Sequence, residues 1–184
     1  MKRILLALLP ATAWAQDRPN VIWLMADDLG YGDLSCYGAT RIHTPNIDRV
    51  AQEGVRFTDM HACASTSTPS RYGILTGEYP FCHPRTDVAA GDASTIIWPQ
   101  QYTLADMMQS VGYRTGAFGK WHLGLGSRTG QQDWNGKIDV GPDSLGFDYS
   151  YIMAATSDRV PCVFIEQGRI ANYDPSAPVQ VSYK

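Results

Sequence analysis

One group of residues in this sequence joins a hydroxyl to a cation at short spacing. Ser67 begins the string Ser-Thr-Pro-Ser-Arg, which places a hydroxyl four residues before Arg71. A guanidinium can hold an oxyanion at two points, and a helix that begins here would direct unpaired backbone N–H groups at the same anion. Taken alone, the string fits an ordinary helix start with a surface arginine better.

Two further groups follow apolar segments. Asp27 and Asp28 offer hard carboxylate oxygens, which suit Ca²⁺ or Mg²⁺ better than Zn²⁺. Acidic pairs at such places are more often turn or capping residues. Lys120 and His122 put a cation and an imidazole on one face of an extended segment. A solvated lysine beside a packed histidine gives the same pattern and is the commoner arrangement. The local sequence alone therefore favours a structural role for both groups.

These groups need a scaffold that brings distant segments together. Unbroken apolar runs are typical of parallel strands that are covered on both faces. The sequence predicts strands at residues 20–26, 55–60, 113–118 and 160–166, the last followed by a turn at 167–168. Since helices alternate with these strands, we expect an α/β fold with a mostly parallel sheet, whose ligands bind beyond the carboxyl ends of the strands.

The predicted helices carry start and stop signals. A Thr-Pro pair or a capping box opens each helix, and a glycine closes it. The pairs are Thr44-Pro45 with Gly54, Thr68-Pro69 with Gly77, and Thr103/Asp106 with Gly112. Residues 127–146 are rich in Gly, Asp, Ser and Asn, and we expect them to form a long surface loop that faces the substrate.

Composition narrows the class of partner. The 184 residues suffice for one domain, and their formal net charge is −3 with no basic stripe. Nucleic-acid binding therefore has no electrostatic support, while small molecules and polysaccharides remain. The four cysteines lack the CxxC spacing of zinc sites, and we expect buried free thiols rather than disulfides.

Residues 1–15 have the pattern of a secretory signal peptide. Lys2 and Arg3 precede a short apolar core, and Ala13-Trp-Ala15 matches a cleavage site. The apolar run is too short for the alternative, a membrane anchor, and no later segment is long enough to span a bilayer. We expect export to the periplasm or the medium, with residues 16–184 as the mature chain.

The string from Ser67 to Gly77 resembles the signature of the formylglycine-dependent sulfatases: Cys or Ser, any residue, Pro-Ser-Arg, then Leu-Thr-Gly. The blocks at residues 18–38, 43–48 and 119–124 are similar to the same family and occur in its order. Together the blocks span most of residues 18–124, which makes the resemblance specific. It implies an alkaline-phosphatase-like α/β fold.

The resemblance also implies roles around residue 67. Ser67 would be oxidised to formylglycine by a maturation enzyme, and the hydrated aldehyde would be a geminal diol. Asp27 and Asp28 would bind a calcium ion that also contacts residue 67. One diol hydroxyl would attack sulfur and release the alcohol, which leaves a covalent sulfo-enzyme. Deprotonation of the other hydroxyl would then expel sulfate and regenerate the aldehyde.

The remaining roles fall on cationic and polar side chains. Arg71 would hold the formylglycine, Lys120 would bind a sulfate oxygen, and His122 would hydrogen-bond the diol. Such preorganised charges stabilise a centre crowded with negative oxygens. The expected substrates are sulfated small molecules or glycans.

Two departures from the family pattern bear on these expectations. The nucleophile position is Ser67 rather than Cys, as in bacterial enzymes matured by an anaerobic radical enzyme. Family members are much longer, and their second half supplies more metal ligands, a general-acid His and another Lys. Ca²⁺ takes about six to eight oxygens, more than Asp27, Asp28 and Ser67 can provide. We therefore expect residues 16–184 to be the N-terminal portion of a catalytic domain.

Two alternatives stay open at this point. Other enzymes of the alkaline-phosphatase superfamily, such as phosphatases and phosphonate hydrolases, share the metal-binding strand end. A truncated, inactive product would also fit the missing ligands.

Overall fold

The computed structural model describes residues 18–130 and 132–183, and it divides into two compact units, Met1–Arg56 and Phe57–Lys184. The signal peptide predicted at residues 1–15 lies outside the described residues. Within the described ranges, no helix is long and apolar enough to cross a membrane.

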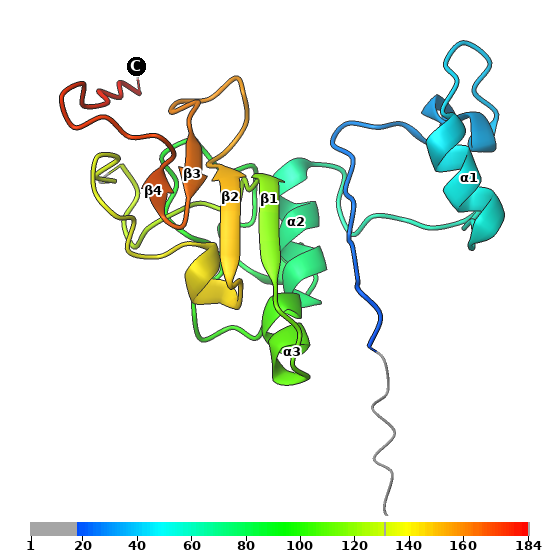
Figure 1. Cartoon of the computed structure of the whole chain (residues 1–184), viewed down its shortest axis with the longest axis horizontal. Coiled ribbons are helices and arrows are strands. Elements are labelled where there is room, and N and C mark those ends of the chain that lie inside the picture. Colours follow the sequence, from blue (N-terminus) through cyan, green and yellow to red (C-terminus); the bar gives the residue numbers. More distant parts are fainter. Residues whose placement is uncertain (1–17, 131, 184) are drawn as a thin grey trace, which may run out of the picture. The chain divides into compact units, whose positions relative to one another are not determined.

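The first unit is built around helix α1, Pro45–Glu53, with the 3₁₀ turns Tyr31–Asp33 and Ser35–Tyr37 before it (Figure 1). The helix starts at the predicted proline and ends before Gly54, as the sequence indicated. Asp48 joins the helix to the preceding turn, because its carboxylate accepts bonds from the Ser35 hydroxyl at 2.6 Å and the Cys36 amide at 2.9 Å. These bonds lower the pKa of Asp48, the Ser35 bond most.

Two predicted strands do not form. Residues 20–26 and 55–60 have no strand assignment, and the side chains of Ile22 and Leu24 are 80% and 90% exposed. A parallel strand gains its stability from a neighbouring ladder and from cover on both faces. Residues 20–26 have neither within the described part of their unit, so the apolar run stays extended without pairing.

The second unit contains a four-stranded sheet in the order β1-β2-β3-β4 (Figure 1). The strands are Gly116–Lys120, Tyr149–Met153, Phe164–Glu166 and Arg169–Ile170. Strand β1 pairs with β2 in parallel, and the other two pairs are antiparallel. The predicted α/β class is confirmed, with a sheet that is mixed in the described residues. Strand β2 was not predicted, and the turn at 167–168 was.

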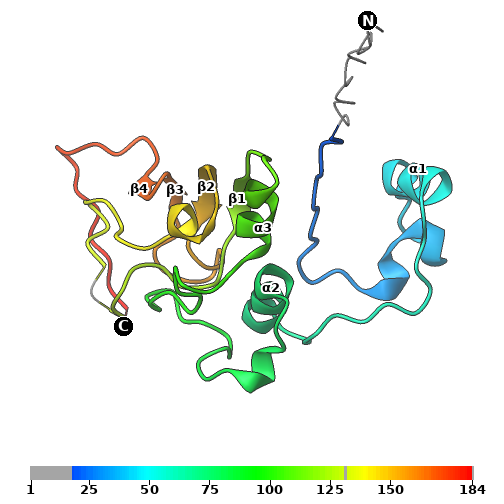
Figure 2. The ribbon, with the colours of Figure 1, turned by 90° about the horizontal axis from the view of Figure 1, so that it is seen from below.

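Helices α2, Ser67–Thr76, and α3, Leu104–Ser110, lie at the β1 side of the sheet (Figures 1 and 2). The capping box of α3 forms as predicted, with the Thr103 hydroxyl accepting from the Asp106 amide at 3.1 Å. Helix α2 ends before Gly77 as predicted but starts earlier than expected, because Thr66 is its N-cap. Thr68 therefore lies in the first turn and is fully buried, not at the cap.

The core of this unit lies under one face of the sheet. Ile152 of β2 and Ile165 of β3 are paired in register, and both are 1% exposed. Residues 127–146 supply Trp134, Ile138 and Leu145 to the same core. The segment predicted as a surface loop is thus partly buried, because its sparse apolar side chains cover the sheet.

The cysteine prediction is half right. All four thiols are free, but Cys36 is only half-buried, and Cys63, Cys82 and Cys162 are exposed.

Candidate active site

Ser67 is the first residue of α2, at the end where backbone N–H groups are unpaired and the helix dipole is positive. Its side chain is half-buried. The Ser67 hydroxyl lies between two groups from different elements: Arg71 Nε donates to its oxygen at 3.0 Å, and His122 Nδ1 is 3.0 Å away. The predicted hydroxyl and cation therefore do meet, one helical turn apart.

His122 follows β1 and is 1% exposed. Its backbone continues the parallel pairing beyond the strand, since its amide donates to Ala154 O at 3.1 Å. Its φ of +55° is not that of an extended strand. The extended segment from which Lys120 and His122 were expected to share one face therefore ends at His122. The second ring nitrogen, Nε2, lies 2.8 Å from Ala89 O. Both ring nitrogens thus have partners.

The tautomer of His122 follows from these partners. A carbonyl oxygen only accepts, so Nε2 must carry the hydrogen toward Ala89 O. Burial lowers the pKa of His122, and the positive charges of Lys120, Arg159 and Arg71 lower it further against the opposing bond to Ala89. The imidazole is therefore neutral near pH 7, and its Nδ1 lone pair accepts the Ser67 O–H.

Arg71 and Lys120 are tied together through the main chain. Arg71 Nη1 donates to Lys120 O at 2.6 Å while its Nε holds Ser67, so one guanidinium bridges α2 and the carboxyl end of β1. The Lys120 side chain is half-buried, and its charge acts on His122. The structure brings Ser67, Arg71, Lys120 and His122 to one place at the end of β1.

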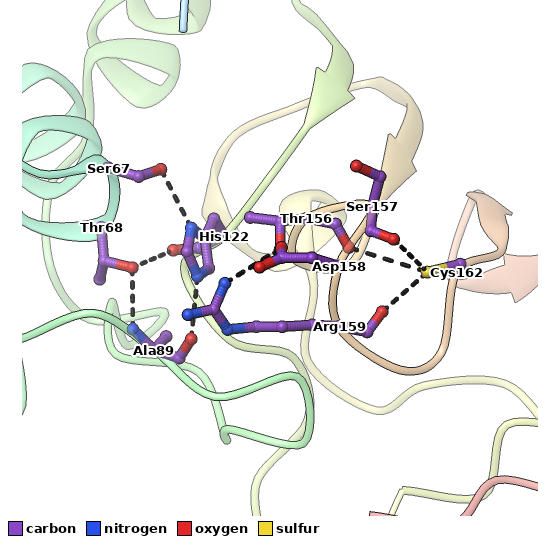
Figure 3. Close-up of polar contacts among 9 residues, drawn as sticks. All are labelled: Ser67, Thr68, Ala89, His122, Thr156, Ser157, Asp158, Arg159 and Cys162. Carbon is purple, nitrogen blue, oxygen red and sulfur yellow. Dashed lines mark hydrogen bonds and ion pairs between the residues drawn. The ribbon is translucent and has the colours of Figure 1, made fainter. Parts of the chain in front are cut away.

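A third cation comes from the loop after β2. The guanidinium of Arg159 points toward His122 (Figure 3), and it donates to Thr156 Oγ1 at 3.0 Å and pairs with Asp158 at 3.3 Å. Three cations, Arg71, Lys120 and Arg159, therefore act on His122, and positive charges so placed favour an oxyanion.

Asp27 and Asp28 belong to the first unit, and both are exposed. Asp28 has a φ of +58°, a left-handed conformation that a non-glycine residue seldom adopts. Among residues 18–130 and 132–183, no cluster of three or more acidic, histidine or cysteine side chains forms a metal site. Two carboxylates and the oxygen of residue 67 suit a hard cation by their chemistry, but they are fewer than Ca²⁺ requires.

The family model described as Sulfatase matches residues 19–161, a stretch that contains all six predicted site residues. This chain belongs to the sulfatase family.

The relatives of this sulfatase chain include both bacterial and human proteins. It is 52% identical over 167 residues to N-acetylgalactosamine-6-O-sulfatase of Bacteroides thetaiotaomicron, covering 91% of this chain and 32% of that protein. It is 42% identical over 128 residues to human arylsulfatase A, covering 68% and 25%. The sulfatase chain therefore spans about a third or less of the length of these relatives.

Solved structures show the same relationship in three dimensions. A sulfatase from the glycosaminoglycan metabolism of Bacteroides thetaiotaomicron superposes with a TM-score of 0.87 at 52% identity, covering 91% of this chain and 35% of that one. Ps i-CgsB, solved in complex with a neocarrahexaose, gives 0.64 at 26% identity over 80% and 36%. The alkaline-phosphatase-like fold expected from the sequence is thus the fold of the sulfatase chain's neighbours.

Three contributors to this group of side chains were not predicted. Ala89 acts through its carbonyl, for which no side-chain signal exists in the sequence. Thr68 was assigned to a cap, and its buried position became visible only with the true start of α2. Arg159 follows the carboxyl end of β2, so the same rule that selected Lys120 would have found it had β2 been predicted.

Gly124 fixes the turn that follows His122. Its φ is +70°, and a Cβ there would lie 2.0 Å from Ser94 O. Gly77 has the same φ with nothing within 4 Å of a Cβ, which makes it a matched control. We expect Gly124→Ala to destabilise the sulfatase chain by about 2–4 kcal/mol and Gly77→Ala by only about 1 kcal/mol. Denaturant unfolding of both variants measures the difference, and equal losses would show that the close approach is unimportant.

Proposed function

We propose that the intact protein hydrolyses sulfate monoesters, with residue 67 as a formylglycine nucleophile. The observation that carries this proposal is the Ser67 hydroxyl, held between Arg71 Nε and His122 Nδ1 at the positive end of α2. Both neighbours come from motifs of the matched family region. A serine so placed is oriented at its oxygen by a donor and an acceptor together.

Each side chain of the site has a distinct task in this proposal. The hydrated aldehyde of residue 67 supplies two hydroxyls. One attacks sulfur and displaces the alcohol of the ester, and deprotonation of the other then re-forms the aldehyde as sulfate leaves. Arg71 orients the residue-67 oxygen and offsets its charge. His122 accepts a proton from the residue-67 diol at Nδ1, because Nε2 already donates its hydrogen to Ala89 O. Lys120 binds a sulfate oxygen, and its charge stabilises the oxyanions of the transition state.

The metal proposal concerns the acidic pair Asp27 and Asp28. Asp27, Asp28 and the oxygen of residue 67 would be among the ligands of a Ca²⁺ ion, with Mg²⁺ as the less fitting hard cation. A bound divalent cation would polarise sulfate oxygens as a Lewis acid. The further ligands that such an ion requires would come from outside this donor set.

The calcium proposal has a readout that does not depend on activity. We expect Asp27→Asn and Asp28→Asn each to weaken Ca²⁺ binding by the intact protein roughly 100-fold or more, because each removes a charged ligand. Isothermal titration with Ca²⁺ measures the affinity. Asp59→Asn, at an exposed carboxylate paired with His61, is the control and should bind normally. Unchanged affinity in both test variants would remove these residues from the metal site.

The substrate class that we propose is sulfated carbohydrate. The supporting observation is the 52% identity to a protein named as an N-acetylgalactosamine-6-O-sulfatase. Residues 1–15 would direct export of the protein to the periplasm or the medium, where it would meet sulfated glycans. A maturation enzyme would oxidise Ser67 by removing two hydrogens. Sulfate release from sulfated sugars supports this class, and release from small aryl esters alone would contradict it.

The reaction type is tested by matched esters. The intact protein, co-expressed with a maturation enzyme, is given sulfate and phosphate monoesters of one alcohol. We expect the sulfate ester to have the higher kcat/KM. A preference for the phosphate ester would instead assign a phosphatase or phosphonate hydrolase of the same superfamily.

A further inference from the structure

Thr68 is the most enclosed polar residue beside the site, with 0% of its surface exposed. Its hydroxyl donates to His122 O at 2.9 Å and accepts from the Ala89 amide at 3.0 Å. A single hydroxyl thus uses both its donor and an acceptor on segments 21 and 54 residues away. Figure 3 shows the three residues joined by these bonds.

We propose that Thr68 is a positioning residue that holds His122 in the tautomer whose Nδ1 accepts the proton of residue 67. The proposal rests on the proposed function, since the tautomer matters for catalysis only if residue 67 is the nucleophile. The tautomer itself depends on one contact, the 2.8 Å approach of His122 Nε2 to Ala89 O. If Ala89 O moves away, Nδ1 is free to carry the hydrogen, and the imidazole then faces residue 67 as a donor.

Thr68 acts on both partners of that contact. Its bond to the Ala89 amide places residue 89, whose carbonyl is the acceptor for Nε2. Its bond to His122 O places the backbone of the histidine, which stands at the left-handed φ of +55°. Because one oxygen sets both positions, its removal changes the distance between Nε2 and Ala89 O directly.

The other side of the Ala89 segment has little room to adjust. A Cβ at Gly91 would lie 2.2 Å from Val160 O and 3.3 Å from the Cβ of Arg159, so the two loops meet closely there. That contact holds the side of the segment that faces the loop after β2. Thr68 holds the side that faces His122, and no other hydroxyl in the described residues bonds both groups.

The test is the ¹⁵N spectrum of the histidines in the intact protein with unmodified Ser67, at about pH 8, above the ordinary histidine pKa. His122→Gln assigns the His122 signals by their loss. We expect Nε2 to carry a directly bonded proton and Nδ1 to give the resonance of an unprotonated nitrogen. Thr68→Val, which keeps the shape and loses the hydroxyl, should convert His122 to a mixture of tautomers. Thr68→Ser should keep the wild-type spectrum.

Kinetics of the matured protein give a second readout. We expect Thr68→Val to lower kcat about tenfold or more with little change in KM, and Thr68→Ser to restore kcat. If the valine variant does not fold, Thr68→Ala and Thr68→Ser are compared, because they differ by a single oxygen. A wild-type spectrum with the hydrogen on Nδ1, or valine and alanine variants with the wild-type tautomer, would overturn the proposal. The spectrum needs neither formylglycine nor turnover, so it separates this proposal from the proposed function.

Discussion

Replacing Ser67 with alanine in the intact protein, co-expressed with a maturation enzyme, is expected to lower sulfate release by roughly 10⁴-fold or more. Alanine removes the oxygen that Arg71 Nε and His122 Nδ1 share, and it leaves a methyl group that no maturation enzyme converts to an aldehyde. Binding of the substrate should persist in part, because Lys120 and Arg71 remain. The measurement is the steady-state release of inorganic sulfate, with kcat and KM determined separately.

The control for this variant is a serine close to residue 67 in sequence. Ser65 is exposed two residues earlier, outside the helix and the signature string, so Ser65→Ala should retain nearly full activity. Circular dichroism and thermal unfolding check that both variants fold. Sulfate release by Ser67→Ala within tenfold of wild type would exclude residue 67 as the nucleophile.

Replacing Arg71 with lysine is expected to lower kcat by about 10²- to 10³-fold although the charge is kept. Arg71 uses Nε for Ser67 and Nη1 for Lys120 O at the same time, a fork that an ammonium group on a flexible stem does not reproduce. The variant should therefore orient the residue-67 oxygen poorly but still attract the sulfate group. We expect kcat to fall more than KM changes.

Because Arg71 is part of the signature string, its replacement can also affect oxidation of Ser67. Activity is therefore expressed per mole of residue 67 that mass spectrometry finds converted. Arg114→Lys, at an exposed arginine, is the matched control and should be unaffected. A corrected kcat for Arg71→Lys equal to wild type would mean that its charge alone matters.

Local signals in the sequence located most helices well. Thr44-Pro45, the capping box at Thr103 and the glycine stops act within one or two turns of the chain, so they predict α1 and α3 closely. The start of α2 was missed because Thr66 caps it with an extended backbone and no side-chain bond. That error hid the role of Thr68.

Strands were harder to predict because their stability comes from partners. Residues 20–26 have a strand-like composition, but the described part of their unit offers no neighbouring strand to pair with. They therefore do not form a strand. Strand β2 follows a glycine-rich segment, and only two of its residues, Ser150 and Ile152, face the core. Because β2 was not predicted, Arg159, in the loop that follows its carboxyl end, was not predicted either.

Four of the predicted site residues lie together, although two of the predicted strands do not form. Ser67, Arg71, Lys120 and His122 were selected by motif, and the structure brings these four together. The contact that orients the histidine comes from the carbonyl of Ala89, and every residue has a carbonyl. Tertiary packing decides which carbonyl faces an imidazole, and this cannot be predicted from the residue types in the sequence.

The most direct test of a formylglycine nucleophile at residue 67 is mass spectrometry of the peptide that carries it, after co-expression of the intact protein with a maturation enzyme that acts on Ser-type sites. We expect a peptide lighter by two hydrogens, with the loss localised to Ser67 and the converted fraction rising in step with sulfatase activity. Full activity in a preparation whose Ser67 is entirely unmodified would contradict it.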